Sequence, residues 1–357
     1  MERKKIIVTG GAGFIGANLC RRLLKDGHYI TCLDNLCTGR RENIKNLERN
    51  PKFNFIKLDI SKAERLGIPS GVNEIYNLAC PASPPQYHRL GQETIDVCTI
   101  GMRNMLELAV ENHAKILQAS TSECYGDPLV HPQHVSYHGN VNCFGRRAKY
   151  DEGKRVAEAR IWTAMESHPE LDAKIVRIFN TYGPYMDPED GRVVSNFIIQ
   201  ALTGQPITIY GDGSQTRSFC FVDDLVEGMI RMMSTEKYLQ TIIDSKTKKE
   251  ILVGRKIPGT KKYGPGVINL ENGLIFTPVL NLGNPREMMV LEFAELVKRL
   301  TKTKSEIELY DLPRDDPTKR QPDILLTTIN LSWEPKVSLE DGLKKTIEYF
   351  KRELKKI

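Results

Sequence analysis

Tyr150 and Lys154 are four residues apart in a segment with helical spacing, so their side chains point to the same side, one turn apart. An ammonium group near a phenol stabilises the phenolate, and we expect it to lower the pKa of Tyr150 from about 10 toward neutrality. Tyr150 would then be a base that removes a proton from a substrate hydroxyl. The spacing alone is common, so its meaning depends on the residues around it.

A run of polar residues, 120–123, follows the fifth predicted strand. Open α/β sheets bind their ligands at the carboxyl ends of the strands. The hydroxyls of Thr121 and Ser122 and the carboxylate of Glu123 would therefore share this edge of the sheet with the tyrosine and the lysine. The combination predicts an active site there.

A glycine-rich turn follows the first predicted strand, with Gly10, Gly13 and Gly16 spaced as Gly-x-x-Gly-x-x-Gly at the start of a helix. Glycines let the backbone pass close to a pyrophosphate, and the free N–H groups and positive end of the helix hold its charge. The place of the motif between a strand and a helix predicts a dinucleotide site.

Two carboxylates complete the predicted dinucleotide site. Asp34 ends the second strand, where it can accept hydrogen bonds from both ribose hydroxyls of an adenosine. Asp34 would repel a 2′-phosphate, which favours NAD over NADP, although Arg40 and Arg41 are near enough in the sequence to offset that repulsion. Asp59 ends the third strand and either accepts from the adenine amino group or caps a turn.

The elements that must position these residues alternate between short β-branched runs and longer segments of helical period, which predicts βαβ units and a parallel sheet. The predicted strands are 6–9, 30–34, 54–58, 75–79, 116–120 and 175–179. The helices between them are 14–25, about 93–111 and 146–165. We therefore predict an α/β fold. It would contain a Rossmann-like doubly wound parallel sheet and a smaller C-terminal substrate-binding lobe.

The composition changes after Tyr182, where Pro and Gly interrupt shorter pieces. We predict a dinucleotide-binding domain over 1–182, to which 218–233 and 278–300 return, and a mainly substrate-binding lobe over 183–357. Further helices are expected near 193–202, 225–233 and 287–300. A last helix, capped by Ser338, is predicted from apolar residues on one face: Leu343, Ile347, Phe350 and Leu354.

A stretch from about 234 to 277 is rich in Lys, Thr and Gly and is predicted to be a surface insertion. Asn272 and Gly273, between the apolar runs 267–270 and 274–277, predict a β-hairpin. Contact with a partner or with a second copy of the chain is the alternative.

The composition is that of a folded globular chain, with 357 residues of which 40% are hydrophobic and 27% charged. A net charge of +6 suits an anionic small ligand and does not predict a nucleic-acid partner. We find no apolar run of membrane-spanning length and no signal peptide, so we expect a cytoplasmic protein without a membrane partner. The 8 cysteines show neither C-x-x-C nor zinc-site spacing, which predicts free thiols and no metal site.

Longer runs across nearly the whole chain resemble the UDP-glucuronate decarboxylases, also called UDP-xylose synthases, within the extended short-chain dehydrogenase/reductases. The runs are 8–16 (VTGGAGFIG), 78–85 (LACPASPP), 120–128 (STSECYGDP), 150–158 (YDEGKRVAE), 177–184 (RIFNTYGP), 190–197 (DGRVVSNF), 210–219 (YGDGSQTRSF) and 319–323 (KRQPD). The exception is 234–277, an insertion atypical of the family.

This resemblance implies a reaction and a cofactor. UDP-glucuronate would be oxidised at C4 with NAD, lose CO₂ as a 4-keto intermediate, gain a proton at C5 and be reduced again at C4 to UDP-xylose. NAD would be tightly bound and recycled, no metal would take part, and the enzyme would be a homodimer.

The resemblance also implies which residues form the site. The catalytic set would be Tyr150, Lys154, Thr121, Ser122, Glu123 and Arg320. The cofactor would contact Gly10, Gly13, Phe14, Ile15, Gly16, Asp34, Asn35, Thr38, Gly39, Asp59, Ile60, Leu78, Tyr150 and Lys154. The substrate would contact Asn180, Arg192, Val194, Tyr210, Arg217 and Arg320, with Tyr210 either bordering the uracil or packed in the core.

Ser122 separates this reaction from that of related sugar-nucleotide 4,6-dehydratases, which carry an Asp here as the acid for a departing hydroxyl. An ionised Asp would repel a substrate carboxylate, whereas a serine hydroxyl can donate to it. Ser122 therefore favours a 6-carboxylate substrate. The alternatives are a sugar-nucleotide 4,6-dehydratase, against which Ser122 argues, a UDP-glucuronate 4-epimerase, and a non-catalytic protein that binds NAD or a nucleotide sugar.

Some residues depart from the family pattern or have a plainer interpretation. Asp96 replaces a cation near the expected substrate loop, and Tyr185 replaces an arginine, so we expect weaker carboxylate binding and one lost phosphate or ion-pair contact. Trp162 is expected in the core or in a dimer contact. Cys80 has no histidine placed to activate it, which favours a packed thiol over a nucleophile.

Overall fold

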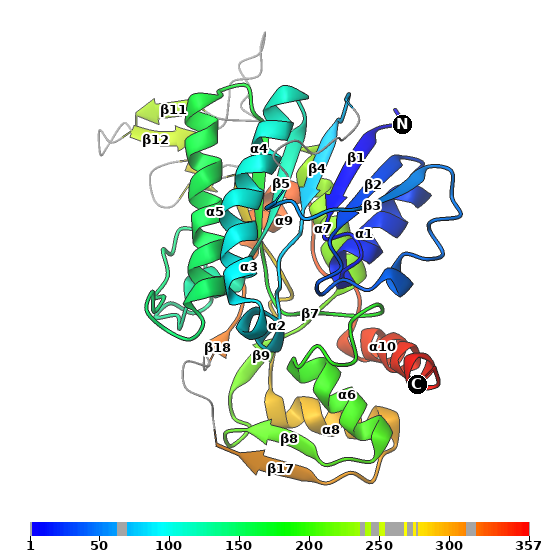
Figure 1. Ribbon diagram of the computed structural model, residues 1–357. Coiled ribbons are helices and arrows are strands. Elements are labelled where there is room, and N and C mark those ends of the chain that lie inside the picture. Colours follow the sequence, from blue (N-terminus) through cyan, green and yellow to red (C-terminus); the bar gives the residue numbers. More distant parts are fainter. Residues whose placement is uncertain are drawn as a thin grey trace.

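The computed structural model describes residues 2–62, 70–235, 240–243, 250–253, 268–269, 274–275, 278–311 and 319–356. A large lobe built around a sheet lies above a smaller lobe, and the C-terminal helix lies beside the smaller lobe (Figure 1). The chain crosses between the lobes several times, so residues from distant parts of the sequence meet at their junction.

The large lobe contains a seven-stranded sheet in the order β15-β6-β5-β4-β1-β2-β3. Its strands are β1 (Lys5–Thr9), β2 (Tyr29–Asp34), β3 (Phe53–Lys57), β4 (Glu74–Asn77), β5 (Lys115–Thr121), β6 (Ala173–Ile178) and β15 (Val279–Leu282). Every neighbouring pair is parallel. The predicted α/β doubly wound fold is confirmed, and β15 extends the sheet beyond the six predicted strands.

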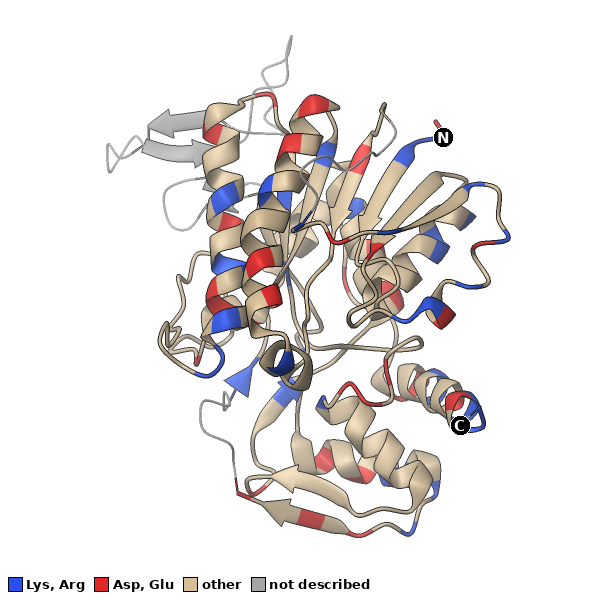
Figure 2. Ribbon diagram, in the orientation of Figure 1, with Lys and Arg blue, Asp and Glu red and all other residues tan. Residues whose placement is uncertain are grey.

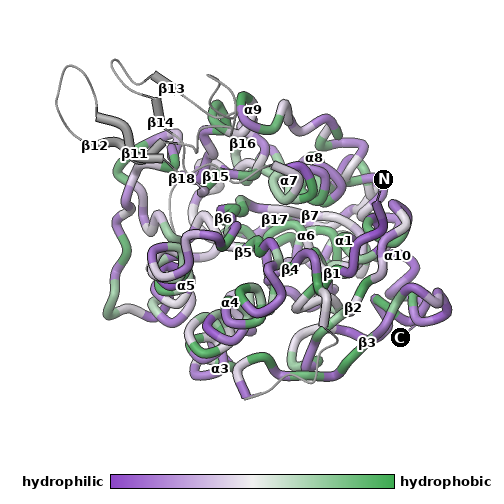
Figure 3. The backbone as a smooth tube through the Cα atoms, turned by 90° about the horizontal axis from the view of Figure 1, so that it is seen from above, coloured by the Kyte–Doolittle hydropathy of each residue, from purple (hydrophilic) through white to green (hydrophobic). Residues whose placement is uncertain are grey.

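Helices cover both faces of the sheet, as the view from above shows (Figure 3). α3 (Gly91–Asp96), α4 (Met102–Glu111) and α5 (Ala148–Ser167) lie on one side, while α7 (Val222–Ser234) and α9 (Leu325–Leu331) lie on the other, with α1 (Phe14–Lys25) packed against α7. Each face buries its own apolar cluster, one with Leu106 and Ile161 and one with Leu19 and Met229. Burial on both faces explains why the central strands are β-branched runs rather than alternating ones.

Two of the predicted helices differ in detail. The segment predicted as one helix over 93–111 contains a π-helical turn, Val97–Gly101, between α3 and α4. The helix predicted from 287 begins later, because Glu287–Met289 form β16 against another strand. α8 (Val290–Thr301) starts only where Glu292 accepts a hydrogen bond from the Met289 backbone N–H.

The small lobe packs α6 (Val193–Thr203) against α8 and adds the parallel pair β8 (Ile207–Tyr210) and β17 (Ile307–Tyr310). The C-terminal α10 (Leu339–Leu354) begins at Ser338, whose hydroxyl accepts from the Asp341 N–H as predicted. The shorter elements are α2 (Pro84–Arg89), which packs against α3, and the paired strands β7 (Thr181–Tyr182) and β10 (Cys220–Phe221), which contact α7.

A three-stranded sheet, β16-β9-β18, joins the two lobes. β9 (Thr216–Ser218) pairs with β18 (Lys319–Arg320), which places Arg320 opposite Arg217. β18 is the blue arrow at the junction of the lobes (Figure 2). Two arginines from distant segments of the chain therefore lie on neighbouring strands at the junction of the lobes.

Short strand pairs are described within 234–277. β11 (Gln240–Ile243) pairs antiparallel with β12 (Glu250–Val253), and β13 (Ile268–Asn269) pairs antiparallel with β14 (Leu274–Ile275). The second pair confirms the predicted hairpin, although its turn residues Asn272 and Gly273 lie outside the described residues. Among the helices in the described ranges, we find none with both the length and the apolar character needed to cross a bilayer.

Candidate active site

A cavity of about 580 Å³ lies between the lobes and is lined by residues from both. All but one of the predicted site residues line it: Gly10, Gly13, Phe14, Ile15, Gly16, Asp34, Asn35, Thr38, Gly39, Asp59, Ile60, Leu78, Thr121, Ser122, Glu123, Tyr150, Lys154, Asn180, Arg192, Tyr210, Arg217 and Arg320. The exception is Val194, which is buried in the core of the small lobe, while its neighbour Val193 lines the cavity. α6 turns the Val194 side chain inward, and its contact with the substrate stays a prediction.

The glycine-rich turn forms a close-packed cradle at the start of α1. Gly10 has a φ of +65°, a left-handed conformation that favours glycine. A Cβ atom on Gly16 would lie only 2.2 Å from the Gly10 carbonyl oxygen. No side chain caps the first turn of α1, so its N–H groups face the cavity side free to bind an anion. These residues fit the pyrophosphate of a dinucleotide.

The Asp34 carboxylate is held at the end of β2 by two backbone donors, the N–H of Leu36 at 2.8 Å and that of Ala12 at 3.0 Å. Burial raises the pKa of Asp34, and these hydrogen bonds only partly oppose that effect. A Cβ on Gly39 would lie 2.7 Å from the carboxylate oxygens, so the loop closes tightly around this group. Carboxylate lone pairs remain for ribose hydroxyls.

The two arginines near Asp34 are engaged with carboxylates. Arg40 donates to Glu353 at 3.1 Å, and Arg41 donates to Glu48 at 3.0 Å. Arg41 does not line the cavity, whereas Arg40 does and its Nη1 has no hydrogen-bond partner among the described residues, so the preference for NAD depends on the charge of Asp34.

Asp59 caps a turn, which is one of the two roles that the sequence left open, and its contact with the adenine amino group stays a prediction. Its Oδ1 accepts from the N–H and hydroxyl of Ser61, which is a turn cap, and its Oδ2 accepts from Asn35 Nδ2 at 3.1 Å. The group also lines the cavity beyond β3.

Tyr150 and Lys154 lie on the cavity side of α5, as predicted. Lys154 Nζ donates to the Ala119 carbonyl at 2.8 Å and lies 5.9 Å from the centre of the Tyr150 ring. The Tyr150 hydroxyl is hydrogen-bonded to Thr121, and its ring stacks on Tyr87 at 5.0 Å between centroids. Residues of β5, α2 and α5 thus surround the phenol.

The expected depression of the Tyr150 pKa is wrong for the chain alone. Burial raises the pKa of Tyr150 well above its ordinary value, and the nearby Cys80 adds to this, while the hydrogen bond with Thr121 opposes it. Burial also disfavours the charge on Lys154, but neighbouring cysteines, Cys80 first, hold the pKa of Lys154 above its ordinary value. The Lys154 ammonium is therefore charged. Even so, burial decides the direction in which the pKa of the Tyr150 phenol is shifted.

Glu123 lies between two guanidinium groups. Arg147 donates to its Oε2 at 2.5 Å and Arg320 donates to the same oxygen at 3.0 Å. Burial alone would raise the pKa of Glu123, but Arg320 and Arg147 hold it below its usual range. The carboxylate is therefore ionised and carries one charge against two cations.

Arg320 is almost fully buried, with 1% of its surface exposed. It donates to the Ser122 carbonyl at 2.7 Å, while its Nε has no hydrogen-bond partner among the described residues. Its competitor Arg314 lies outside the described residues. The sequence reasoning missed Arg147, although its position three residues before Tyr150 places it on the same face of the helix.

Asp151 follows Tyr150 but points away from the cavity into a buried position. Its Oδ1 has no hydrogen-bond partner among the described residues, and Arg147 Nε lies 3.7 Å from Oδ2. Burial raises the pKa of Asp151 to about 7, with the negative charge of Glu123 adding to the effect. Near and above neutral pH, ionisation of this buried carboxyl group lowers the free energy of unfolding of the protein.

We expect Asp151→Asn to stabilise the protein at pH 8. A raised folded-state pKa means that the native chain holds a proton that the unfolded chain has lost between about pH 4 and pH 7, so stability falls as pH rises through this window. The asparagine should remove this loss, which is on the order of 4 kcal/mol at pH 8. Urea unfolding of both proteins at several pH values, spaced by about one unit between about pH 5 and pH 8, measures this difference in the free energy of unfolding. Parallel pH profiles for both proteins would contradict the assignment, and Glu152→Gln, at a partly exposed pair with Arg155, is the matched control.

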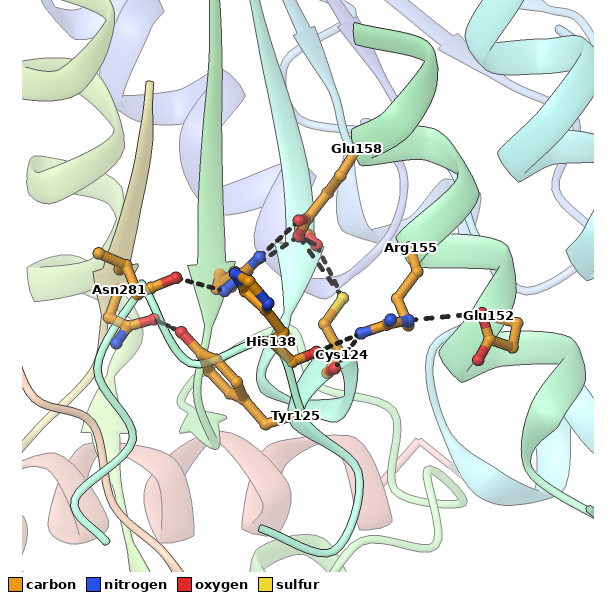
Figure 4. Close-up of polar contacts among 10 residues, drawn as sticks. Cys124, Tyr125, His138, Glu152, Arg155, Glu158 and Asn281 are labelled. Atoms are coloured by element: carbon orange, nitrogen blue, oxygen red, sulfur yellow. Dashed lines mark hydrogen bonds and ion pairs between the residues drawn. The ribbon is translucent and has the colours of Figure 1, made fainter. Parts of the chain in front are cut away.

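A polar network behind the end of β5 fixes the strand that carries Thr121 (Figure 4). Glu158 of α5 accepts from Ser120 at 2.5 Å and pairs with Arg177 of β6 at 2.7 Å, and Cys124 lies 3.5 Å from it. Tyr125 donates to Asn281 of β15 at 2.7 Å. Charge-assisted hydrogen bonds of this kind hold a strand end more firmly than neutral ones. The hydroxyl-bearing edge is thus anchored to α5, β6 and β15.

The cavity side formed by the small lobe supplies cations. Arg192 is held by Asp190 at 2.5 and 2.9 Å, Arg217 donates to the Thr216 carbonyl, and Asn180 lies nearby in the lining. Tyr210 is 48% exposed at the rim, so it is not a core residue. Guanidinium groups of this kind suit a diphosphate.

The two residues that depart from the family pattern lie differently with respect to the cavity. Asp96 does not line the cavity, and its carboxylate accepts from Gln92 Nε2 at 2.9 Å, so it places no anion beside the ligand. Tyr185 lines the cavity with the Arg21 guanidinium 3.7 Å from its ring centre. Arg21 itself does not line the cavity, so the expected loss of one phosphate or ion-pair contact stays a prediction.

The chain matches known proteins over most of its length. The model of the NAD dependent epimerase/dehydratase family matches residues 6–242. UDP-glucuronic acid decarboxylase 1 of Danio rerio is 45% identical over 353 residues, which are 99% of this chain and 74% of the relative. UDP-glucuronic acid decarboxylase 6 of Arabidopsis thaliana is 43% identical over 351 residues, which are 98% of this chain and 90% of the relative.

Solved structures agree with this placement. The UDP-glucose 4-epimerase from Thermotoga maritima with UDP-glucose superposes with a TM-score of 0.80 at 26% identity, over 98% of this chain and 99% of that chain. The UDP-glucuronic acid 4-epimerase from Bacillus cereus, in complex with UDP-glucuronic acid and NAD, has a TM-score of 0.77 at 25% identity over 98% and 99%. The chain therefore belongs to the NAD dependent epimerase/dehydratase family, among its UDP-glucuronic acid decarboxylases.

Proposed function

We propose that this protein converts UDP-glucuronate to UDP-xylose and CO₂, with NAD recycled in place. The observation that carries the proposal is the grouping of Arg147, Arg320 and Glu123 at the end of β5, next to Tyr150. Arg147 and Arg320 outnumber the ionised Glu123, and Asp151 beside Arg147, with a pKa of about 7, offsets only part of this excess, so a net positive charge remains where the 6-carboxylate of the sugar must bind. The names of the relatives, at 42–45% identity over nearly the full chain, support the same reaction.

The nucleotide sugar binds with its diphosphate in the small lobe, against Arg192, Arg217 and Asn180. Tyr210 borders the uracil at the rim, where its exposed ring offers a stacking surface. This places the sugar between the lobes, beside Tyr150 and Glu123. The cofactor binds on the opposite side of the cavity, along Gly10, Gly16 and Asp34.

Tyr150 removes the proton of the 4-hydroxyl. Bound NAD supplies the hydride acceptor and later the hydride donor at C4, together with a positive charge that favours the Tyr150 phenolate. Thr121 holds the phenol oxygen and donates to the developing 4-oxygen, and Lys154, fixed by the Ala119 carbonyl, keeps a cation on this side. The product of this step is a 4-keto sugar acid.

Loss of CO₂ follows because the carboxylate now stands β to a ketone. The electrons of the broken C5–C6 bond collect on the 4-oxygen as an enolate, which Tyr150 and Thr121 stabilise by hydrogen bonding. Ser122 and Arg320 hold the carboxylate before it leaves, and Glu123 orients the ring or a water for protonation at C5. Return of hydride to C4 gives UDP-xylose.

We expect Asp34→Asn to weaken NAD binding about 10- to 100-fold, the loss that corresponds to hydrogen bonds with a charged group. The amide keeps the side-chain shape but loses one acceptor and the negative charge that selects against a 2′-phosphate. The gap between NAD and NADP affinity should therefore narrow. Fluorescence titration of protein stripped of nucleotide measures both constants, with the partly exposed Asp26→Asn as control. An unchanged NAD constant would remove Asp34 from the cofactor site.

The experiment that tests the function adds UDP-glucuronate to the purified protein without added NAD. Mass spectrometry and proton NMR follow the sugar, and absorbance follows NADH. Formation of UDP-xylose with no lasting NADH supports the decarboxylase with a retained cofactor. Accumulation of a 4-keto pentose with NADH supports decarboxylation but contradicts recycling. Unchanged UDP-glucuronate with NAD added, or its 4-epimer, contradicts the proposal.

We also propose a homodimer that pairs the face of α5 with its copy. Trp162 and Val156 of α5 are exposed, with Trp162 at 48%, so Trp162 is not a core residue. Trp162→Glu is expected to shift the protein from dimer to monomer in size-exclusion chromatography with light scattering, because it places a charge on this apolar face. Leu309→Glu, which changes an exposed apolar position of β17, should leave the protein at the mass of the dimer in the same measurement. A monomeric parent protein would contradict the proposal.

A further inference from the structure

Two cysteines from separate elements meet at the wall of the active-site cavity. Cys80, in the loop after β4, lines the cavity and is partly exposed. Cys98 lies behind it in the π-helical turn and is buried. Their sulfur atoms are 3.6 Å apart. A disulfide needs about 2.05 Å, so a shift of roughly 1.5 Å would join them.

We propose that Cys80 and Cys98 form an oxidisable dithiol beside Lys154, which a hydroperoxide converts to a disulfide within the active site. Cys80 is the sulfur that a small oxidant can reach from the cavity, and Cys98 is the sulfur placed behind it to resolve the product. π-Helical turns are frequent at functional sites, and this one places Cys98 against the loop rather than along a regular helix face.

The surroundings favour this division of roles. Burial disfavours a charge on Cys80, but the hydrogen bond with Cys98 and the Lys154 ammonium outweigh it and lower the pKa of Cys80 to about 7. The pKa of Cys98 is raised well above its usual range by the same hydrogen bond and by burial. Near neutral pH, Cys80 therefore supplies a thiolate and Cys98 a thiol, as attacking and resolving cysteines require.

The reaction balances with a hydroperoxide as the only co-reactant. The Cys80 thiolate attacks one peroxide oxygen, the O–O bond breaks, and the departing oxygen takes a proton to leave as water or an alcohol. The Cys98 sulfur then attacks the Cys80 sulfenic acid, the S–O bond breaks, and the Cys98 proton leaves with the hydroxyl as water. Two thiols lose two electrons in total, and the peroxide gains them. A small dithiol reverses the change through a mixed disulfide.

A second pair of cysteines provides an internal comparison. Cys20 and Cys32 are hydrogen-bonded to each other, yet both are fully buried in the core and neither lines the cavity. If sulfur proximity alone decided the outcome, both pairs would oxidise. If access from the cavity and the thiolate beside Lys154 decide it, only Cys80 and Cys98 will.

Oxidation of the two cysteines should also inhibit the enzyme. It removes the Cys80 thiolate from Lys154 and draws the cavity wall toward the π-helical turn. We expect turnover of the enzyme to fall at least about tenfold and to return after treatment with a dithiol, since a group near the chemistry has moved by more than 1 Å. This activity readout rests on the proposed function, whereas the covalent readout does not.

The test treats the folded holoenzyme with hydrogen peroxide, blocks free thiols with an alkylating agent and maps peptides by mass spectrometry. A linked peptide pair containing Cys80 and Cys98, about 2 Da lighter than the two thiol peptides together, is expected and should disappear after dithiol treatment. Cys20 and Cys32 should be alkylated only after denaturation. Cys98→Ser should abolish the link, whereas Cys143→Ser, at an exposed cysteine outside the cavity, should form it as the parent does.

Several outcomes would overturn the proposal. These are absence of the linked pair in the parent protein, an equal yield of the Cys20–Cys32 link, or conversion of Cys80 to its sulfinic acid while Cys98 stays reduced. If Cys98→Ser does not fold, as circular dichroism would show, the comparison between the two pairs in the parent protein decides alone. A link that forms without any fall in turnover would overturn the inhibitory part.

Discussion

Replacing Tyr150 with phenylalanine is expected to lower kcat about 10³-fold, within the range that a positioned acid–base group contributes. The change removes only the phenol oxygen, while the ring keeps its stacking on Tyr87 at 5.0 Å. KM for UDP-glucuronate and the affinity for NAD should change little, because the substitution alters neither the arginines proposed to bind the diphosphate nor Asp34, which is proposed to bind NAD. Initial rates of UDP-xylose formation and a nucleotide titration measure the two effects.

Tyr137→Phe is the matched control for this experiment. The Tyr137 hydroxyl also forms a hydrogen bond, accepting from the Leu129 N–H at 3.0 Å, but it does not line the cavity. It should keep the rate of the parent protein. A Tyr150→Phe protein that folds, binds NAD and retains more than about a tenth of kcat would show that another group removes the proton.

The dinucleotide half of the site could be predicted from the sequence because its determinants are local. The turn from Gly10 to Gly16 and the start of α1 are contiguous, and Asp34 follows on the adjacent strand of the sheet. A strand, a glycine turn and a helix impose one geometry with little help from the rest of the chain. The structure accordingly places each predicted glycine and Asp34 in the lining of one cavity.

Electrostatics at the catalytic half could not be predicted in the same way. The spacing of Tyr150 and Lys154 is visible in the sequence, but the pKa of the phenol depends on burial by distant segments and on Cys80, 70 positions away in the chain. Desolvation is a property of the assembled fold. The sequence therefore identified the pair of residues and gave the wrong direction for the shift in the chain alone.

Contacts across long sequence separations were the other missed features. Arg21 reaches Tyr185, and Cys80 meets Cys98 through a π-helical turn that no periodicity predicts. The position of Asp96 outside the cavity lining could not be predicted either, because helix orientation decides which side of α3 faces the cavity. Arg147 could have been found, since it is one turn before Tyr150 on the same face.

Glu123→Gln is expected to lower kcat about 10²-fold or more while KM for UDP-glucuronate stays level or falls. Glu123 is the one carboxylate that Arg147 and Arg320 share, at 2.5 and 3.0 Å. The neutral amide leaves an extra positive charge for the substrate carboxylate, which strengthens binding of the ground state and so does not speed the reaction. It also removes the ionised group that assists protonation at C5.

The step affected can be separated from the first oxidation. In a single turnover, NADH absorbance should still rise in Glu123→Gln and then decay more slowly than in the parent protein, because Tyr150 and Thr121 are unchanged. Glu152→Gln on α5, whose carboxylate pairs with Arg155 away from the cavity, should behave as the parent protein does. A raised KM with unchanged kcat would mean that Glu123 serves substrate binding alone. Loss of the NADH rise itself would place its role before the oxidation, at the same step as Tyr150.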